Sequence, residues 1–211
     1  MTKLLIGTNN RSKINMYKNI FSELEIDIDN IYYLDDFDSI PEPVENGYTV
    51  KDNALLKAKY YNKKFDMNVL ADDAGFAIKV LDWKPWVKAR RWWWQLDDDV
   101  SDEDFLDFFM DKIKDLPGND SWLLKASFPF VRCLYLKEWK NTYYQKDKID
   151  VYLQKKARKP IKDGWPVQSC LVYPDGRHAY DIPKDDPIWK ENFKVDWLID
   201  LLNKRFSIKY S

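Results

Sequence analysis

The chain has 211 residues, enough for one domain with a sizeable hydrophobic core, and we expect residues 1–211 to form a single domain. Its 34 basic and 35 acidic residues give a net charge of −1, so no general attraction draws it toward nucleic acid or an anionic membrane. No apolar run approaches membrane-spanning length, and the N-terminus lacks the apolar segment of a signal peptide. Two distant cysteines, Cys133 and Cys170, suit a reducing compartment. We therefore expect a cytoplasmic protein without nucleic-acid or membrane partners.

The N-terminal pattern predicts a strand, a polar loop and a helix. Residues 3–7 form the apolar run of the strand, and apolar residues recur at helical spacing over residues 14–24. The loop offers four polar side chains, which are Thr8, Asn9, Asn10 and Lys13. The free N–H groups and the positive dipole end of a helix N-terminus can bind a phosphate group. The loop does not have the GxxxxGK(S/T) spacing of a Walker loop. A simple Asn- or Ser-capped helix is the alternative interpretation.

A second helix is predicted after an acidic, proline-containing loop. Residues 26–33 favour a strand, and two prolines make residues 35–43 irregular. Thr49 followed by Asp52 resembles a capping box, which predicts a helix over residues 50–63. Within that helix Asn53 and Lys57 are one turn apart and share a face, and Glu45 stands on the loop just before it.

Two adjacent carboxylates follow the next strand. Residues 69–71 are apolar, Asp72 and Asp73 come directly after them, and Gly75 is expected to let the chain turn. Ligands of open α/β sheets bind at the carboxyl ends of the strands. Because adjacent side chains on an extended segment point in opposite directions, one carboxylate can face a metal while the other holds the loop. The alternative is a polar turn without a ligand.

The remainder of the chain predicts further strands and helices. Strands are expected over residues 77–81, 128–136, 149–153 and 169–173, and helices over residues 101–116 and 189–202. The stretch 82–94 mixes basic and aromatic residues, which can stack bases or form a subunit contact; for Trp92 to Trp94 we favour the contact. His178 is the only histidine and is expected at the surface. A single histidine without a nearby serine partner argues against a Ser-His-Asp hydrolase, and no His/Cys spacing supports a zinc site.

Three segments together resemble the Ham1-like inosine triphosphate pyrophosphatase family. Residues 4–13 resemble its opening L-x-T-x-N-x-x-K, and residues 45–58 resemble E-x-G-x-T-x-x-x-N-A-x-x-K-A. Residues 70–76 resemble its L-A-D-D-S-G-L turn. The resemblance implies a two-lobed mixed α/β fold of the Ham1/Maf type, with a long central sheet, an active-site cleft and usually a homodimer. It also implies Mg²⁺-dependent hydrolysis of nucleoside triphosphates, especially non-standard purines such as ITP, dITP and XTP, to monophosphate and pyrophosphate.

The resemblance assigns roles to named residues. It implies that Glu45 and Asp73 hold Mg²⁺, that Asp73 orients or deprotonates the attacking water, and that Asp72 supports it. The implied substrate-binding residues are Thr8, Asn9, Asn10, Lys13, Asn53, Lys57, Ala74, Arg91, Trp165 and Lys194.

The chain departs from the family pattern where the base would be read. Ala74 replaces a serine, which removes one substrate hydrogen bond, and Trp86 stands where glycine is usual. Residues 164–169 replace the G-F-G-Y-D-P motif, and residues 190–192 are a poor counterpart of S-H-R. The alternative function is therefore a catalytically silent member, natural or engineered, that binds nucleotide or assembles through its aromatic patch.

Overall fold

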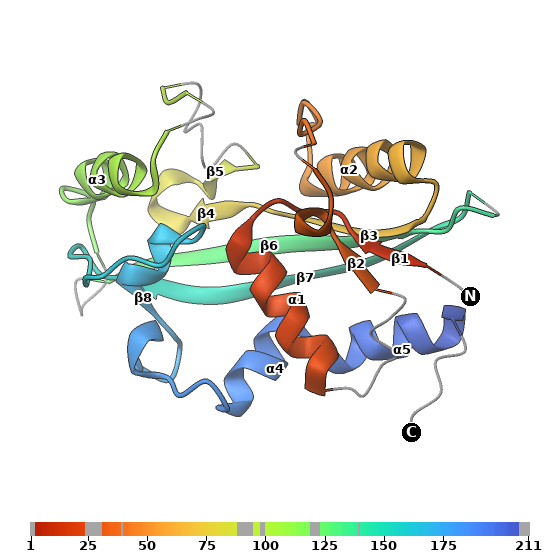
Figure 1. Ribbon diagram of the computed structural model, residues 1–211. Helices are drawn as coiled ribbons and strands as arrows, with labels where there is room; N and C mark the ends of the chain where they lie inside the picture. The colour runs from red at the N-terminus through yellow and green to blue at the C-terminus, as the bar shows by residue number, and fades with distance from the viewer. Residues whose placement is uncertain are drawn as a thin grey trace. The chain divides into compact units, whose positions relative to one another are not determined.

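The computed structural model describes residues 3–23, 31–38, 40–87, 95–97, 100–118, 123–138 and 140–206 (Figure 1). The chain has a mixed α/β fold that divides into two compact units. The first unit contains residues 1–73, 130–147 and 193–211, and the second contains residues 74–129 and 148–192. Two long strands, β6 (Leu124–Tyr135) and β7 (Thr142–Leu153), contribute residues to both units.

The first unit is built on short parallel strands. They are β1 (Leu4–Ile6), β2 (Ile31–Tyr33) and β3 (Asn68–Ala74). Leu5 of β1 pairs with Tyr32 on one side and with Val69 on the other, and β3 also neighbours β6. Because helices cover both faces of this sheet, consecutive strand residues are buried, as the apolar runs predicted.

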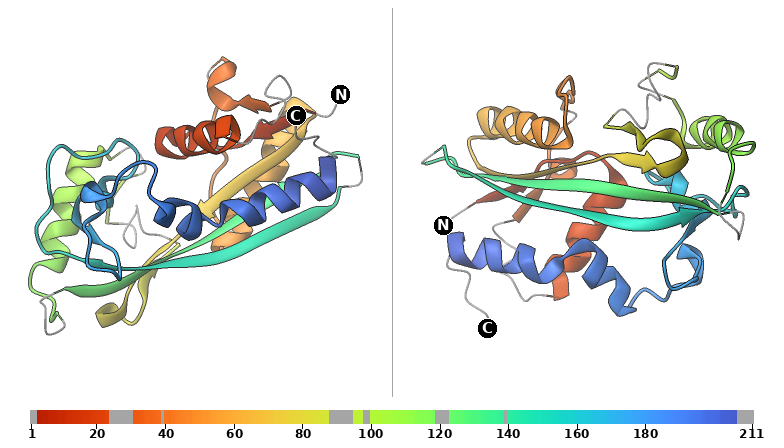
Figure 2. Two further views of the ribbon diagram at one scale, coloured as in Figure 1. Left: turned by 90° about the horizontal axis from the view of Figure 1, so that it is seen from below. Right: turned by 180° about the vertical axis from the view of Figure 1, so that it is seen from behind.

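Three helices cover these strands. They are α1 (Arg11–Glu23), α2 (Val50–Phe65) and α5 (Val195–Phe206). Helix α2 lies on one face, and α1 and α5 lie on the other, as Figures 1 and 2 show. The core on the α1 and α5 face joins Leu4, Ile6, Tyr17, Phe21, Leu70, Leu134, Leu198 and Leu202.

Gly7 explains how closely α2 approaches the sheet. A Cβ atom at Gly7 would lie 2.9 Å from Val69 Cγ1 and 3.0 Å from Tyr61 Cδ2 of α2. Those distances are too short for a side chain, so glycine is needed where the polar loop leaves β1.

The second unit combines antiparallel strands with α3. Its elements include β4 (Phe76–Ile78), β5 (Lys84–Trp86), β8 (Leu171–Val172), α3 (Asp102–Ile113) and α4 (Pro187–Phe193). Strand β4 pairs with β5 and β6, and β8 pairs with β7. Ser101 caps α3, because its hydroxyl accepts the Asp104 N–H at 3.0 Å.

The Asp-Asp pair does not lie in a turn. Asp72 and Asp73 are inside β3, and the positive-φ glycines of the described chain, Gly164 and Gly176, do not include Gly75. The N–H of Gly75 donates to Pro129 O at 2.8 Å, so the chain continues along β6 into β4 instead of reversing. Pairing with β6 overrides the low strand propensity of aspartate.

Other expectations also needed correction. The predicted C-terminal helix is two helices, broken at Lys194, where φ is +49°. The strand predicted over residues 169–173 forms only at Leu171–Val172, because Ser169 and Cys170 end the 3-10 helix Pro166–Cys170. His178 is buried, with 3% of its surface exposed, because it packs under Tyr180 instead of facing solvent. Arg91 and residues 92–94 lie outside the described residues. No helix in the described ranges is long and apolar enough to cross a membrane.

Candidate functional site

Two of the predicted carboxylates meet at a single lysine in the first unit. Lys57 of α2 places its Nζ 3.2 Å from Glu45 Oε1 and 3.1 Å from Asp73 Oδ1. Lys57 and Asp73 are buried, with 8% and 7% of their surfaces exposed, and Glu45 is partly buried on the loop before α2. Residues that are 28 positions apart in sequence therefore form one charged cluster at the end of β3.

Asn53 connects the loop to the strand. Its Nδ2 donates to Asp73 Oδ2 at 3.3 Å, and its Oδ1 accepts the N–H of Gly47 at 2.8 Å. The predicted capping box fixes the start of α2, because the Thr49 hydroxyl accepts the Asp52 N–H at 3.1 Å and the Asp52 carboxylate accepts the Thr49 N–H at 3.0 Å. One helical turn thus orients Asn53 and Lys57 toward the same carboxylate.

Asp72 is directed toward α1. Its Oδ2 lies 2.7 Å from Lys13 Nζ, and 6% of the residue is exposed. The loop before Lys13 is held by its own polar groups, because Asn10 Oδ1 accepts the Lys13 N–H at 3.0 Å and Thr8 Oγ1 accepts the Asn10 N–H at 3.3 Å. The capped-helix interpretation therefore has structural support, and the exposed Asn9 remains at the surface.

Charge and burial act against each other in this cluster. Burial raises the pKa of Glu45, while the neighbouring Lys57 lowers it less strongly. Burial would also raise the pKa of Asp72, but Lys13 and Lys57 together hold that pKa below its usual range. For Lys57, burial lowers the pKa, but the negative charges of Asp73 and Glu45 outweigh it and raise the pKa. Lys57 therefore stays protonated, and Asp72 stays ionised, at neutral pH.

The donor set fits a hard divalent cation. Oxygens of Glu45 and Asp73 already converge on one positive centre, the Lys57 ammonium group. No three His, Cys, Asp or Glu side chains within the described ranges form a complete metal cage. Mg²⁺ does not need one, because it commonly binds one or two carboxylates and completes its octahedron with water and phosphate oxygens.

The other predicted site residues are not all part of this cluster. Trp165 belongs to the second unit, where its ring meets Phe128 edge-on with centroids 5.9 Å apart, and the exposed Ala74 belongs to that unit as well. Lys194 belongs to the first unit, 3.8 Å from Asp147, beside a cavity of about 410 Å³ that Trp197 also lines.

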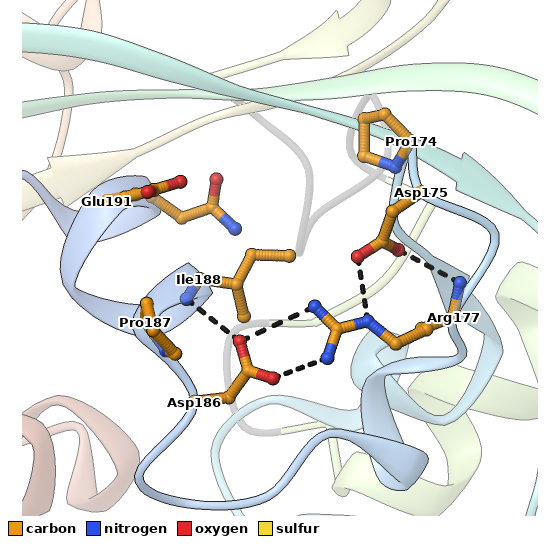
Figure 3. A pocket seen from close by; sticks show the side chains of 8 residues that line it. Pro174, Asp175, Arg177, Asp186, Pro187, Ile188 and Glu191 are labelled. Atoms are coloured by element: carbon orange, nitrogen blue, oxygen red, sulfur yellow. Dashed lines mark hydrogen bonds and ion pairs between the residues drawn. The ribbon is translucent and has the colours of Figure 1, made fainter.

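A cavity of about 570 Å³ in the second unit is a poor site for phosphate (Figure 3). The carboxylates of Asp175, Asp186 and Glu191 line it, against the single guanidinium group of Arg177. That guanidinium group is occupied, because it donates to Asp175 Oδ2 at 2.7 Å and also to Asp186. The excess negative charge would repel a triphosphate.

Arg132 is a buried charged residue that the sequence analysis did not single out. This arginine is 2% exposed and lies on β6 between two buried residues, Val131 and Cys133. A charged residue at an inward-facing strand position is a signal that could have identified it, because such groups are buried only when they are compensated.

Comparisons with known proteins bear on the family of the chain. The sequence pattern described as the Ham1 family matches residues 4–173 of the chain. A dITP/XTP pyrophosphatase of Oceanobacillus iheyensis is 32% identical over 120 residues, which is 57% of this chain and 58% of that protein. One of Corynebacterium efficiens is 34% identical over 115 residues, which is 54% of each chain. The alignments thus span little more than half the length of these curated relatives.

Solved structures show the same fold. A HAM1 protein from Coxiella burnetii superposes with a TM-score of 0.73 at 20% identity, covering 97% of this chain and 100% of that one. The Staphylococcus aureus Ham1 protein superposes with a TM-score of 0.69 at 20% identity, covering 96% and 99%. At such identity the likeness concerns the fold.

Proposed function

The chain belongs to the Ham1 family, and we propose that it is a nucleoside triphosphate pyrophosphatase. It would hydrolyse a nucleoside or deoxynucleoside triphosphate to the monophosphate and pyrophosphate. The observation that supports this most strongly is the pair of carboxylates, Glu45 and Asp73, on either side of Lys57. The names of the relatives from Oceanobacillus iheyensis and Corynebacterium efficiens support non-standard purines such as dITP and XTP as substrates.

In the proposed reaction, the oxygen of a water molecule bonds to the α-phosphorus and the α–β anhydride bond breaks. Asp73 orients this water and takes its proton, and Asn53 holds Asp73 in place through the 3.3 Å hydrogen bond. Pyrophosphate leaves with the electron pair of the broken bond. The ammonium groups of Lys13 and Lys57 neutralise the charge of the phosphates, so positioning and electrostatics account for most of the catalysis.

We further propose Mg²⁺ as the cofactor, with Glu45 and Asp73 as the residues that would hold it. When bound, the ion would neutralise charge on the phosphate oxygens. The fit rests on the hard oxygen donors described above and on the negative excess of the cluster, in which two carboxylates, Glu45 and Asp73, face the single ammonium group of Lys57.

The remaining contacts are proposed in two groups. Thr8, Asn9, Asn10 and Lys13 would hold the triphosphate at the N-terminus of α1, together with Lys57. Ala74, Arg91, Trp165 and Lys194 would contact the rest of the nucleotide, as their matching positions in the family resemblance suggest.

We also propose a cytoplasmic homodimer in which residues 1–211 act as one domain. The two buried free cysteines, Cys133 and Cys170, support a reducing compartment. The exposed rings of Trp86 and Trp197, at 42% and 43%, are suitable for a contact between copies.

A nucleotide-binding role without turnover is the second candidate. Trp86 stands where the family pattern has glycine, and its φ of +62° is a conformation that glycine adopts readily and tryptophan rarely. Such a residue persists only when its surroundings hold it, which favours a remodelled pocket.

One assay separates the two candidates. ITP, XTP, dITP, dUTP and the four common triphosphates are incubated with the protein and Mg²⁺ in ¹⁸O-water, and pyrophosphate is distinguished from orthophosphate. The proposal predicts pyrophosphate from one or a few nucleotides, with the label in the monophosphate. Binding of a nucleotide by folded protein without pyrophosphate release would favour the second candidate instead.

A further inference from the structure

Arg132 is a buried cation that contacts only neutral acceptors. Its Nε donates to Tyr17 Oη at 3.3 Å, and its Nη1 donates to Gln145 Oε1 at 2.6 Å and to Phe193 O at 2.5 Å. No carboxylate among the described residues forms a hydrogen bond or ion pair with it. Because a buried charge is unfavourable unless it is compensated, a nearby negative charge would stabilise Arg132 beyond these neutral contacts.

Asp72 is that charge, on the neighbouring strand. Leu70 of β3 and Leu134 of β6 point into the same core cluster, and side chains alternate along a strand, so Asp72 and Arg132 share that face. The register agrees, because Ala77 pairs with Ser127 and Gly75 N–H donates to Pro129 O. Continuing this antiparallel register along the same strand brings Asp72 opposite Arg132.

Helix α1 connects the two charges. Lys13 and Tyr17 are one turn apart on α1, and Lys13 reaches Asp72 at 2.7 Å while Tyr17 reaches Arg132 at 3.3 Å. Burial raises the pKa of Asp72, but Lys13 and Lys57 outweigh it, and Arg132 adds a smaller effect in the same direction as the two lysines, so that pKa stays below its usual range.

Asp72 depends on a lysine that the proposed reaction needs elsewhere. Its Oδ1 is buried and accepts no hydrogen bond within the described residues, while its Oδ2 is paired with Lys13. If Lys13 turns toward a substrate phosphate, Asp72 loses this partner and remains a buried carboxylate. The unfavourable energy of that state would oppose phosphate binding unless another cation stabilised Asp72.

We propose that Arg132 is a positioning residue that balances the charge of Asp72, so that Lys13 can leave Asp72 and bind a phosphate group of the substrate. This inference rests on the proposed function, because it takes Lys13 as a phosphate ligand. Without the charge of Arg132, Asp72 retains Lys13 and the triphosphate binds more weakly.

Binding of inorganic tripolyphosphate, measured by calorimetry, tests the inference without turnover. We expect Arg132→Gln to raise the Kd by at least about fivefold, the usual lower limit of coupling between two sites. Arg132→Lys keeps the charge and should restore most of the affinity. Gln145→Met removes a neutral partner of the guanidinium group and serves as the matched control, with an unchanged Kd.

A double-mutant cycle excludes a merely structural role. In the Asp72→Asn background residue 72 has no charge that could retain Lys13. Adding Arg132→Gln to that background should therefore change the Kd by less than twofold. This corresponds to about the 0.3–0.5 kcal/mol within which mutations at independent sites are additive. An equal loss of affinity in both backgrounds would overturn the inference, and so would an unchanged Kd in Arg132→Gln alone.

Folding and the proposed function are tested separately. If Arg132→Gln does not fold, the double variant Asp72→Asn/Arg132→Gln must fold, since it buries no unbalanced carboxylate; an unfolded double variant contradicts the inference. Wild-type protein that binds tripolyphosphate but releases no pyrophosphate would refute the proposed reaction alone. Failure of the wild-type protein to bind tripolyphosphate would contradict the proposed phosphate site, and it would also contradict this inference, which depends on that site.

Discussion

Lys57 holds two carboxylates together that would otherwise repel each other. Its ammonium group lies 3.2 Å from Glu45 and 3.1 Å from Asp73, and the negative charges of both raise its pKa. The same arrangement explains why the cluster suits a metal ion, because a second cation beside Lys57 would relieve the remaining negative charge.

Lys57→Met tests whether the stability of the protein depends on a cation between Glu45 and Asp73. Breaking a buried ion pair by removing one partner is expected to lower the free energy of unfolding by about 3–5 kcal/mol in EDTA. Mg²⁺ should restore more stability to the variant than it adds to the wild type, because the two carboxylates then lack any other cation. Urea denaturation with and without Mg²⁺ measures both effects.

Lys137→Met is the matched control for that prediction. Lys137 forms an exposed ion pair with Asp66, so its loss should change stability by no more than about 1 kcal/mol, with no added response to Mg²⁺. An identical Mg²⁺ response of wild type and Lys57→Met would contradict the metal assignment.

Part of the site could be predicted because its residues are close in sequence or lie on one helical face. Helical spacing predicted the shared face of Asn53 and Lys57, and the capping box predicted the start of their helix, whereas the role of Glu45 came from the family resemblance alone. The relation of Asp72 to Arg132 could not be predicted. Those residues are 60 positions apart, and only the pairing of β3 with β6 brings them to one face.

At the scale of elements, the junction between the Glu45 loop and α2 determines the geometry of the cluster. Gly47 has no room for a side chain: a Cβ would lie 2.4 Å from Asn53 Oδ1 and 2.8 Å from Asp52 Cβ. The close approach of Gly47 lets Asn53 accept the Gly47 N–H and still donate to Asp73.

Gly47→Ala should therefore displace the loop while leaving α2 formed. We expect a loss of about 10²-fold in kcat/KM, the size expected when a catalytic group is misplaced by about 1 Å, with helical circular dichroism unchanged. Asn46→Ala, at the exposed neighbouring position, should retain activity. Equal activity of the two variants would show that this junction does not position Glu45 or Asn53.

The extent of several elements could not be predicted because tertiary pairing overrides local preference. Asp72 and Asp73 continue β3, and the polar residues 142–148 continue β7, since partner strands satisfy their backbone groups. The helix break at Lys194 carries no glycine or proline signal, although its φ of +49° is typical of a helix end.

At the scale of the whole molecule, one side chain dominates the expected acid sensitivity near neutral pH. His178 is the only histidine of the chain, and burial, followed by the charge of Arg158, lowers its pKa. Its Nδ1 accepts the Tyr180 N–H at 3.0 Å, and the other ring nitrogen lies 3.2 Å from Ser169 O, so the neutral ring fits both contacts. The unfolded chain therefore takes up a proton at higher pH than the folded one.

Stability should accordingly fall as the pH drops below about 6.5, the ordinary pKa of histidine. The contribution of His178 can reach about 1.4 kcal/mol per pH unit between its unfolded and folded pKa values. The free energy of unfolding is measured for wild type and for His178→Asn between pH 7 and 5. The difference between the two proteins at each pH gives the contribution of His178. Parallel curves for the two proteins would contradict the assignment.

The most direct test of the account is pyrophosphate release by Asp73→Asn. The variant should lose about 10²–10⁴-fold in kcat, the contribution of a positioned general base, while its melting temperature confirms that it is folded. Asp66→Asn is the matched control: Asp66 is exposed and left-handed at the end of α2, where asparagine is tolerated, so activity should be retained. Wild-type turnover by folded Asp73→Asn would show that the reaction does not depend on this carboxylate.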